Sequence, residues 1–220
     1  AWHDVDSYNV YLQIRDCHNT GDIECSAFLT QGWDKGQATS CARMGVTGGI
    51  IGYVNGFADS PALISGCISV TATGSDSFCS LLSAKISFCG IAGMTSHATI
   101  ENCSAETKFE DSSLELDALK LAAVGGVIGH LRHNSSITGG QYSVEIALPK
   151  TEIPYLGVAA GGCYANGAAS QTLSITGTKF CGSIAYKGFE PAMAITVENL
   201  NDYLISFGNC DTEGVSLWTK

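Results

Sequence analysis

The 220-residue sequence has little proline, little charge and few basic side chains, and each shortage removes a class of protein. With only four prolines and 15% charged residues, the chain matches neither collagen nor a disordered linker. Eleven basic residues against 21 acidic ones give a net charge of -10. Such a chain repels phosphate, so nucleic acid is not expected as a partner.

Several sequence signals are also missing. No uninterrupted apolar run reaches the ~18 residues of a membrane helix, so we expect no membrane span. The sequence begins with Ala1 and shows no signal-peptide pattern, and we expect it to be part of a longer polypeptide. No CxxC pair, G-x-S-x-G elbow, phosphate-binding loop or EF-hand is found. We therefore predict no catalytic residue, no metal site and no cofactor.

Glycine is abundant instead, and it recurs in a pattern. The chain has 26 glycines and 45% hydrophobic residues. Apolar segments bounded by glycine, here called glycine knots, occur in "TGGIIG" (47–52), "CGIAG" (89–93) and "VGGVIG" (124–129), and more loosely in "LGVAAGG" (156–162). Each is followed by a polar loop and then by an isoleucine that stands three residues before Cys, Gly or Thr. This self-similarity indicates a repeat protein.

The isoleucines give the repeat its period. Ile64, Ile100, Ile137 and Ile175 are separated by 36, 37 and 38 residues, and Ile14 before Cys17 marks a half copy. Apolar residues alternate with polar ones in the copies, as in short strands. Such repeats bury a core only by stacking, which predicts an all-β parallel β-solenoid of four to five repeats. A β-sandwich is the competing fold, and the spacing leaves open one large coil or two small ones per repeat.

Details within the copies predict where the chain turns. The step of three from Ile137 to Gly140 breaks the strand alternation and predicts a corner. The pair Gly125–Gly126 predicts φ freedom and close backbone approach. Helices are expected only at 112–123 and 197–206.

We predict a single domain, residues 1–220. Its parts are an N-terminal cap (1–11), the repeats (12–185) and a C-terminal cap (186–220).

The ten cysteines do not form a metal-binding pattern. Cys17, Cys67 and Cys103 occupy the same position of the repeat, which predicts free thiols stacked inside the solenoid as small apolar side chains. Disulfides between loops are the alternative.

Titratable residues are scattered. His130 and His133 are predicted to lie in an exposed polar loop, with a metal pair as the alternative, since no third ligand is identifiable. The densest acidic group is predicted to be a solvated face, with calcium or a cationic ligand as the alternative; it comprises Glu106, Glu110, Asp111, Glu115 and Asp117.

Aromatic residues in loops are candidates for ligand binding. We predict a binding site at Trp33, with Asp34 and Lys35 beside it, because the flanking glycines of "TQGWDKGQ" leave the indole reachable. The alternative is that Trp33 closes the end of the solenoid. Tyr53 and Phe57 are further exposed candidates, whereas Trp2 and Trp218 are more typical of caps.

The glycine knots and the Ile-x-Asn/Gly-Cys segments that follow them, together with "CHNTGDI" (17–23), resemble GLUG-type repeats over residues 12–185. The last copy fits only with an insertion within 156–165. These repeats occur in large surface proteins of Bacteroidetes and in extracellular regions of some Gram-positive surface proteases. The resemblance implies a β-helical stalk or adhesion-like protein in an extracellular or cell-surface location.

Two classes of function remain. The first is a non-enzymatic, adhesin-like binding or structural module, whose loops would bind a host or dietary glycan or an extracellular protein. The second is a carbohydrate-active β-helix lyase or hydrolase, or the repeat region of a surface protease. An enzyme of that kind needs carboxylates or a basic residue converging in one groove. The sequence shows no such concentration and favours the binding module.

Overall fold

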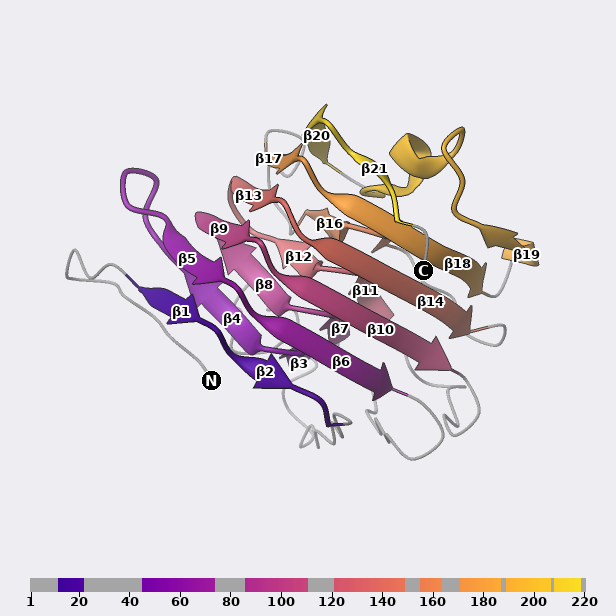
Figure 1. The fold of residues 1–220 in the computed structure, drawn as a ribbon, viewed down its shortest axis with the longest axis horizontal. Helices are drawn as coiled ribbons and strands as arrows, with labels where there is room; N and C mark the ends of the chain where they lie inside the picture. The colour runs from indigo at the N-terminus through magenta and orange to yellow at the C-terminus, as the bar shows by residue number, and fades with distance from the viewer. Residues whose placement is uncertain are drawn as a thin grey trace, which may run out of the picture.

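The computed structural model describes residues 12–21, 45–73, 86–110, 121–148, 155–163, 171–186, 189–206 and 208–218, and these are nearly all β-strand. Four successive segments each run through four strands, and the segments stack on one another (Figure 1). The expected parallel β-solenoid is confirmed. Each repeat makes one four-strand coil, which answers the question that the spacing left open.

The strands follow the same order in every coil. A half coil, β1 (Gln13–Arg15) and β2 (His18–Asn19), comes first. The four coils are β3 (Gly45–Gly48), β4 (Ile51–Asn55), β5 (Ala62–Ser65) and β6 (Ile68–Thr73); β7 (Ile86–Cys89), β8 (Ala92–Ser96), β9 (Ala98–Glu101) and β10 (Ser104–Glu110); β11 (Leu121–Gly125), β12 (Ile128–Leu131), β13 (Ser135–Thr138) and β14 (Gln141–Leu148); and β15 (Leu156–Gly157), β16 (Ala160–Cys163), β17 (Thr172–Thr176) and β18 (Lys179–Tyr186). After them come β19 (Phe189–Ala194), the 3-10 helix η3 (Leu200–Tyr203), β20 (Asn209–Glu213) and β21 (Ser216–Leu217).

Corresponding strands pair in parallel and build four sheets. Sheet D contains β3, β7, β11 and β15, and sheet A contains β4, β8, β12 and β16. Sheet B contains β1, β5, β9, β13, β17 and β20, and sheet C contains β2, β6, β10, β14 and β18. At the last coil β18 also pairs with β21 in parallel and with β19 in antiparallel orientation.

The isoleucine anchors set the register of sheet B. Ile14 pairs with Ile64, Ile64 with Ile100, Ile100 with Ile137, and Ile137 with Ile175. Ile64, Ile100, Ile137 and Ile175 are fully buried. The repeat read from the sequence is therefore the repeat of the structure. Strand alternation sends the residues on either side of each anchor to the outer face.

The corner between sheets B and C is the same in every coil. One residue there has a positive φ of 50–65°, and it is Asp16, Gly66, Asn102, Gly139, Gly177 or Gly214. Only Gly, Asn and Asp adopt this left-handed conformation without much strain, which explains the choice of residues. The residue after it is Cys17, Cys67, Cys103, Gly140, Thr178 or Val215. The corner predicted from the step of three at Ile137 is confirmed.

The glycine knots lie between sheets D and A, where the backbones of neighbouring coils meet. A side chain at Gly126 would collide with the carbonyl group of Val158, and one at Gly90 would collide with that of Gly126. The predicted close approach is confirmed. The predicted φ freedom is not used, because neither Gly125 nor Gly126 has a positive φ.

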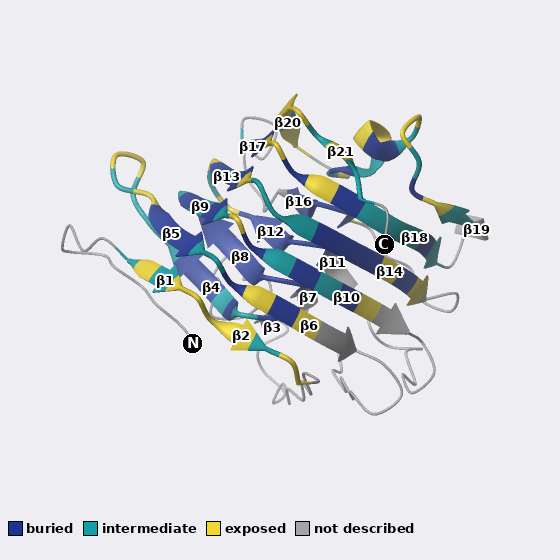
Figure 2. Ribbon diagram, viewed as in Figure 1, coloured by how far each residue is buried: buried dark blue, intermediate teal, exposed yellow. Residues whose placement is uncertain are grey.

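The core lies between the sheets, and the outward side chains of sheets B and C are mostly exposed or intermediate (Figure 2). Within it, Tyr142 and Phe180 stack in neighbouring coils, with ring centroids 5.6 Å apart. Cys67 and Cys103 are buried free thiols in register at the corner, as predicted. Cys17 holds the same corner position but is exposed, which corrects the prediction for that thiol: it lies in the outermost described half coil.

The C-terminal segment closes part of the last coil. The N–H of Val158 donates to the carbonyl group of Tyr203. The N–H groups of Ala159 and Ala160 both donate to the carbonyl group of Leu204. Leu200 and Leu204 are buried against the core. Residues 200–205 thus cover the edge of β15 and β16.

Within the described residues, no helix is long and apolar enough to cross a membrane.

Some local expectations are wrong. A helix was expected over 112–123. Its last residues, 121–123, belong to β11, because pairing with β7 overrides helical propensity. Its first residues, 112–120, lie outside the described residues. In 197–206 only the four residues of η3 are helical. The last knot needs no insertion, since Gly125 pairs with Gly157 and Ile128 with Ala160, each 32 residues further on.

Candidate functional site

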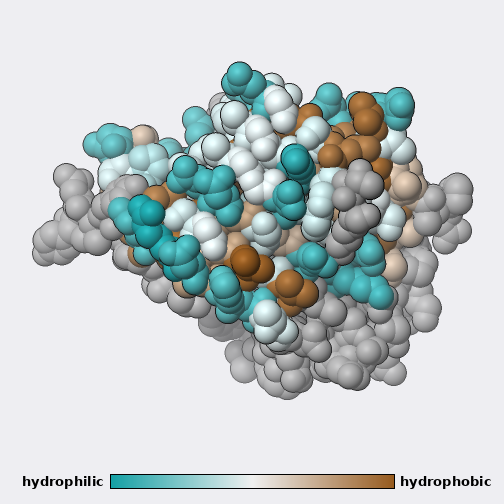
Figure 3. All heavy atoms as spheres, viewed as in Figure 1, coloured by the Kyte–Doolittle hydropathy of each residue, from teal (hydrophilic) through white to brown (hydrophobic). Residues whose placement is uncertain are grey.

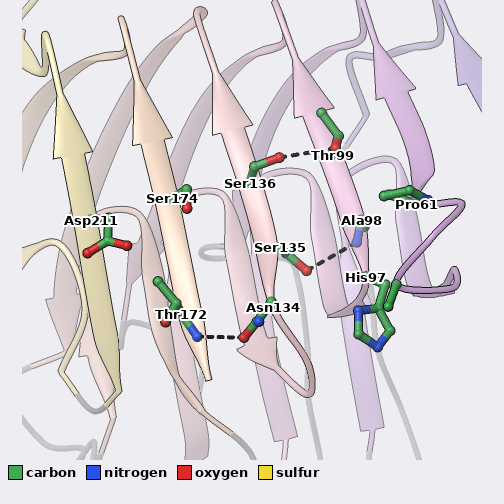
Figure 4. A pocket seen from close by; sticks show the side chains of 11 residues that line it. Pro61, His97, Ala98, Thr99, Asn134, Ser135, Ser136, Thr172, Ser174 and Asp211 are labelled. Atoms are coloured by element: carbon green, nitrogen blue, oxygen red, sulfur yellow. Dashed lines mark hydrogen bonds between the residues drawn. The ribbon is translucent and has the colours of Figure 1, made fainter. Parts of the chain in front are cut away.

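A groove of about 510 Å³ lies on the outer face of sheet B (Figure 4). Thr99, Ser136, Ser174 and Asp211 form its floor, in register on β9, β13, β17 and β20. Thr99, Ser136 and Ser174 each directly precede a buried isoleucine of the anchor row, so alternation turns their side chains outward, and Asp211 continues their row on β20. The groove is therefore built by the repeat itself, and its volume falls in the range of small-molecule sites.

Hydroxyl groups on the floor and at one end are held in fixed positions. The Ser136 hydroxyl donates to Thr99 Oγ1 at 3.0 Å. Ser135 Oγ accepts from the Ala98 N–H at 3.2 Å and donates to the His133 carbonyl. These contacts fix the positions of the Thr99, Ser135 and Ser136 oxygen atoms in the groove lining.

The corner between sheets A and B forms one end and the rim of the groove. Its length differs from coil to coil. In the first described coil, a turn closed by two hydrogen bonds between Phe57 and Ser60 carries Ala58 and Pro61 to the groove. In the third, Asn134 Oδ1 accepts from the N–H of Thr172 at 2.9 Å.

Two stacked histidines lie at this corner. The ring centroids of His97 and His133 are 4.8 Å apart, and the two rings are nearly parallel. His97 faces the groove. Burial lowers the pKa of the His97 imidazole. Burial, and then the charges of His97 and Arg132, lower the pKa of His133. A lowered pKa favours the neutral form of each ring, and a neutral imidazole can both donate and accept hydrogen bonds.

Ser96 Oγ lies 2.8 Å from His133 Nδ1, which resembles the pairing of a nucleophile with its base. Ser96 is only 1% exposed, however, so its hydroxyl cannot reach a substrate. The contact orients the His133 ring.

The histidine pair of the sequence analysis is not brought together. His130 is buried on β12, in register with Met94, which corrects the prediction of an exposed loop. His133 is partly exposed at the corner. Among the described residues, no group of three or more His, Cys, Asp or Glu side chains is placed to hold a metal ion.

Other predicted site residues fall in different places. Trp33, Asp34 and Lys35 lie outside the described residues, so their binding role stays a prediction. Of the acidic group, Glu106 lies on β10 and is partly exposed, and Asp111, Glu115 and Asp117 lie outside the described residues. Tyr53 is buried, not exposed, and Arg132 Nη1 donates to its hydroxyl at 2.8 Å.

The groove on sheet B was not predicted, although the sequence contains a signal for it. Thr99, Ser136 and Ser174 each stand one residue before an aligned isoleucine, and Asp211 stands one before Thr212, which pairs with Ile175. Aligning the repeats on the anchors would have shown hydroxyl side chains at this outer position in three successive copies, after Leu63 in the first.

The surface next to the groove is mixed. On the face viewed in Figure 3, hydrophobic areas are small and separated by hydrophilic ones. Among the described side chains of sheet C, the exposed large hydrophobic residues are Ile68 and Val70 on β6, at 41% and 44% exposure. Two side chains of this size make a small patch. No protein-family model, curated protein or solved structure matches the chain.

Proposed function

We propose that the chain is a non-enzymatic binding and structural module, adhesin-like and located outside the cell or at its surface, whose groove on sheet B holds a glycan. The β-solenoid is consistent with a structural repeat module. The observation that carries the binding role is the row Thr99, Ser136, Ser174 and Asp211 along the groove floor.

The chemistry of the groove fits a neutral ligand rich in hydroxyl groups. Its lining combines Ser and Thr hydroxyls, the Asn134 amide, a neutral imidazole and one carboxylate, so it offers both donors and acceptors. No Lys or Arg lines it among the described residues, which disfavours a phosphate or sulfate ligand. The row extends along the stacking direction, as a site for an extended chain of sugars would.

Hydrolysis is not part of the proposal. A glycosidase needs two carboxyl groups flanking the scissile bond. Within the described lining, Asp211 is the only carboxylate. The resemblance to GLUG-type repeats supports the surface location and the adhesion-like role.

The test is a screen of the purified chain against arrayed glycans and extracellular-matrix proteins, with and without calcium, with the same arrays sampled for released products. Thr99→Val removes a hydroxyl from the groove, and Thr138→Val makes the same change on the same outer face outside it. We expect glycan binding without turnover, weakened about tenfold by Thr99→Val and unchanged by Thr138→Val.

Three results would contradict the proposal or redirect it. Release of products would make the chain an enzyme. Equal effects of the two valine variants would place the ligand elsewhere. If Trp33→Ala abolishes binding while Thr99→Val does not, the site is the segment around Trp33, Asp34 and Lys35.

A further inference from the structure

The two ends of the described stack carry the same half coil. At one end, residues 13–19 run from β1 through the corner residue Asp16 to β2. At the other, residues 209–217 run from β20 through the corner residue Gly214 to β21. Asp16 has a φ of 51° and Gly214 a φ of 64°, and each stands two residues before a strand of sheet C. The ends therefore match in shape.

A hydrogen bond that recurs at every corner is incomplete at both ends. The N–H of the positive-φ residue at each corner donates to the carbonyl group of the residue that precedes the corner of the next coil. The five bonds run from Asp16 to Ser65 (3.0 Å), Gly66 to Glu101 (3.0 Å), Asn102 to Thr138 (2.8 Å), Gly139 to Thr176 (2.7 Å) and Gly177 to Glu213 (2.7 Å). The next donor in this series is the N–H of Gly214. At the opposite end, no described residue donates an N–H to the carbonyl group of Arg15.

The thiol contacts identify the Arg15 carbonyl as an equivalent acceptor. The carbonyl groups of Ser65 and Glu101 each accept the thiol two residues further on as well as the N–H of a neighbouring corner. The carbonyl group of Arg15 accepts the Cys17 thiol in the same way, at 3.5 Å. It is thus the first member of the series, and within the described part of the chain it lacks only the backbone donor.

A second recurring bond points to the same junction. The carbonyl group of the residue after each corner accepts the N–H that opens the sheet C strand of the next coil. Examples are Ile68 to Cys17 (2.9 Å), Ser104 to Cys67 (2.9 Å) and Ser216 to Thr178 (3.1 Å). The next acceptor is the carbonyl group of Val215, and the matching donor at the opposite end is the N–H of His18.

The side chains at the two ends have opposite charge. Arg15, Ser65, Glu101, Thr138, Thr176 and Glu213 form one row across the outer face of sheet B. Continuing it would place Arg15 of one chain next to Glu213 of another, at the ~4.8 Å spacing of paired strands. The neighbouring row ends in the neutral amide of Gln13 and the carboxylate of Asp211, so it places no like charges at the junction. Inside, Cys17, exposed at the end of the stack, would be covered by Val215.

From this match we propose that copies of the chain associate head to tail. The corner and strands of residues 209–217 of one copy pair with residues 13–19 of the next copy as one more step of the solenoid. Such a contact joins two different surfaces and does not close on itself, so it generates rods. Six strands of sheet B per copy give a rod an axial repeat of about 29 Å at ~4.8 Å per strand.

The test is sedimentation velocity of the full 220-residue chain across a concentration series, under reducing conditions. Wild type is expected to form oligomers whose mass rises with concentration. Glu213→Arg and Arg15→Glu each place like charges at the junction, and each is expected to weaken association about tenfold. Glu145→Arg makes an equal charge change at an exposed position on β14, in the middle of the stack, and is expected to leave association unchanged.

Mixing the two charge-reversed variants gives the sharpest result. Every junction between Glu213→Arg and Arg15→Glu again joins opposite charges, so the mixture is expected to assemble although neither variant does so alone. Alkylation of Cys17 should slow as wild type assembles, because the junction covers that thiol. A wild-type chain that stays monomeric overturns the proposal, as do oligomers that the end variants leave unchanged or a mixture that fails to assemble.

Discussion

The two corners that flank sheet B differ in how much they vary. The corner leading into it holds six residues between β4 and β5 (56–61) but only His97 between β8 and β9. The corner leading out, to sheet C, is two residues long in every coil and has a positive φ at the same position. The constant corner keeps the coils in register, whereas the variable corner forms one end and the rim of the groove. Fold and candidate function are thus carried by opposite ends of the same strands.

The two corners should differ most in how much an insertion lowers the free energy of unfolding. Two glycines inserted after Gly139 would break the hydrogen bond from Gly139 to Thr176 and shift β14 against its neighbours. We expect loss of cooperative unfolding, or a fall in unfolding free energy of about 4 kcal/mol or more. The same insertion after Asp59, at the tip of an exposed turn, should cost about 1 kcal/mol or less. Urea denaturation followed by circular dichroism measures both, and equal costs would contradict the distinction.

Within the constant corner, two glycines should respond differently to the same substitution. Gly140 has a φ of 83°, and a Cβ there would collide with the carbonyl oxygen of Cys103. Gly140→Ala should cost about 3 kcal/mol or more. Gly177 has a φ of 61° with open space around it, so Gly177→Ala should cost only about 1–2 kcal/mol of backbone strain. Urea midpoints of the two variants test this, and the reverse order would mean that the contact at Gly140 is not formed.

The thiols of the constant corner report on the stacking of the coils. Burial raises the pKa of the Cys103 thiol to about 12, so almost none of it is thiolate at pH 8. Cys103 and Cys67 should react with iodoacetamide only after unfolding, while the exposed Cys17 reacts in the native chain at low protein concentration. Peptide mapping by mass spectrometry before and after denaturation gives the rates. Native alkylation of Cys103 would show that the coils do not stack there.

The histidines of the variable corner should make the free energy of unfolding depend on pH. The pKa values of His97 and His133 are lowered in the folded chain, so the unfolded chain binds protons more readily near the ordinary histidine pKa of ~6.5. The unfolding free energy should therefore fall as pH decreases from 7 through that value towards the folded pKa values. Urea titrations of wild type and the His97→Gln/His133→Gln variant measure this. An unchanged pH slope in the variant would show that other groups are responsible.

The sequence predicted the constant corner well and the variable corner poorly, for physical reasons. A residue that must be buried and in register, such as Ile137, or that must adopt a positive φ, such as Gly139, is restricted in type and recurs at a fixed spacing. The groove imposes no such restriction on Thr99 or Ser136, whose side chains are typical of any outer face. Its end and rim depend on how corners of unequal length fold, and the sequence spacing does not reveal this. Tyr53 and His130 were misplaced for a different reason: both were expected in loops, whereas they lie on β4 and β12 and are buried there.

The most direct test of the account is to obstruct the groove and measure glycan binding. Ser136→Lys places a long, non-aromatic side chain on the groove floor, and Thr138→Lys places the same side chain on the same strand, two residues away and outside the groove. With both variants confirmed as folded by urea denaturation, they are applied to the same glycan arrays as wild type. We expect Ser136→Lys to lose the wild-type binding pattern and Thr138→Lys to keep it. Retention of the pattern by Ser136→Lys would show that the groove on sheet B is not the binding site.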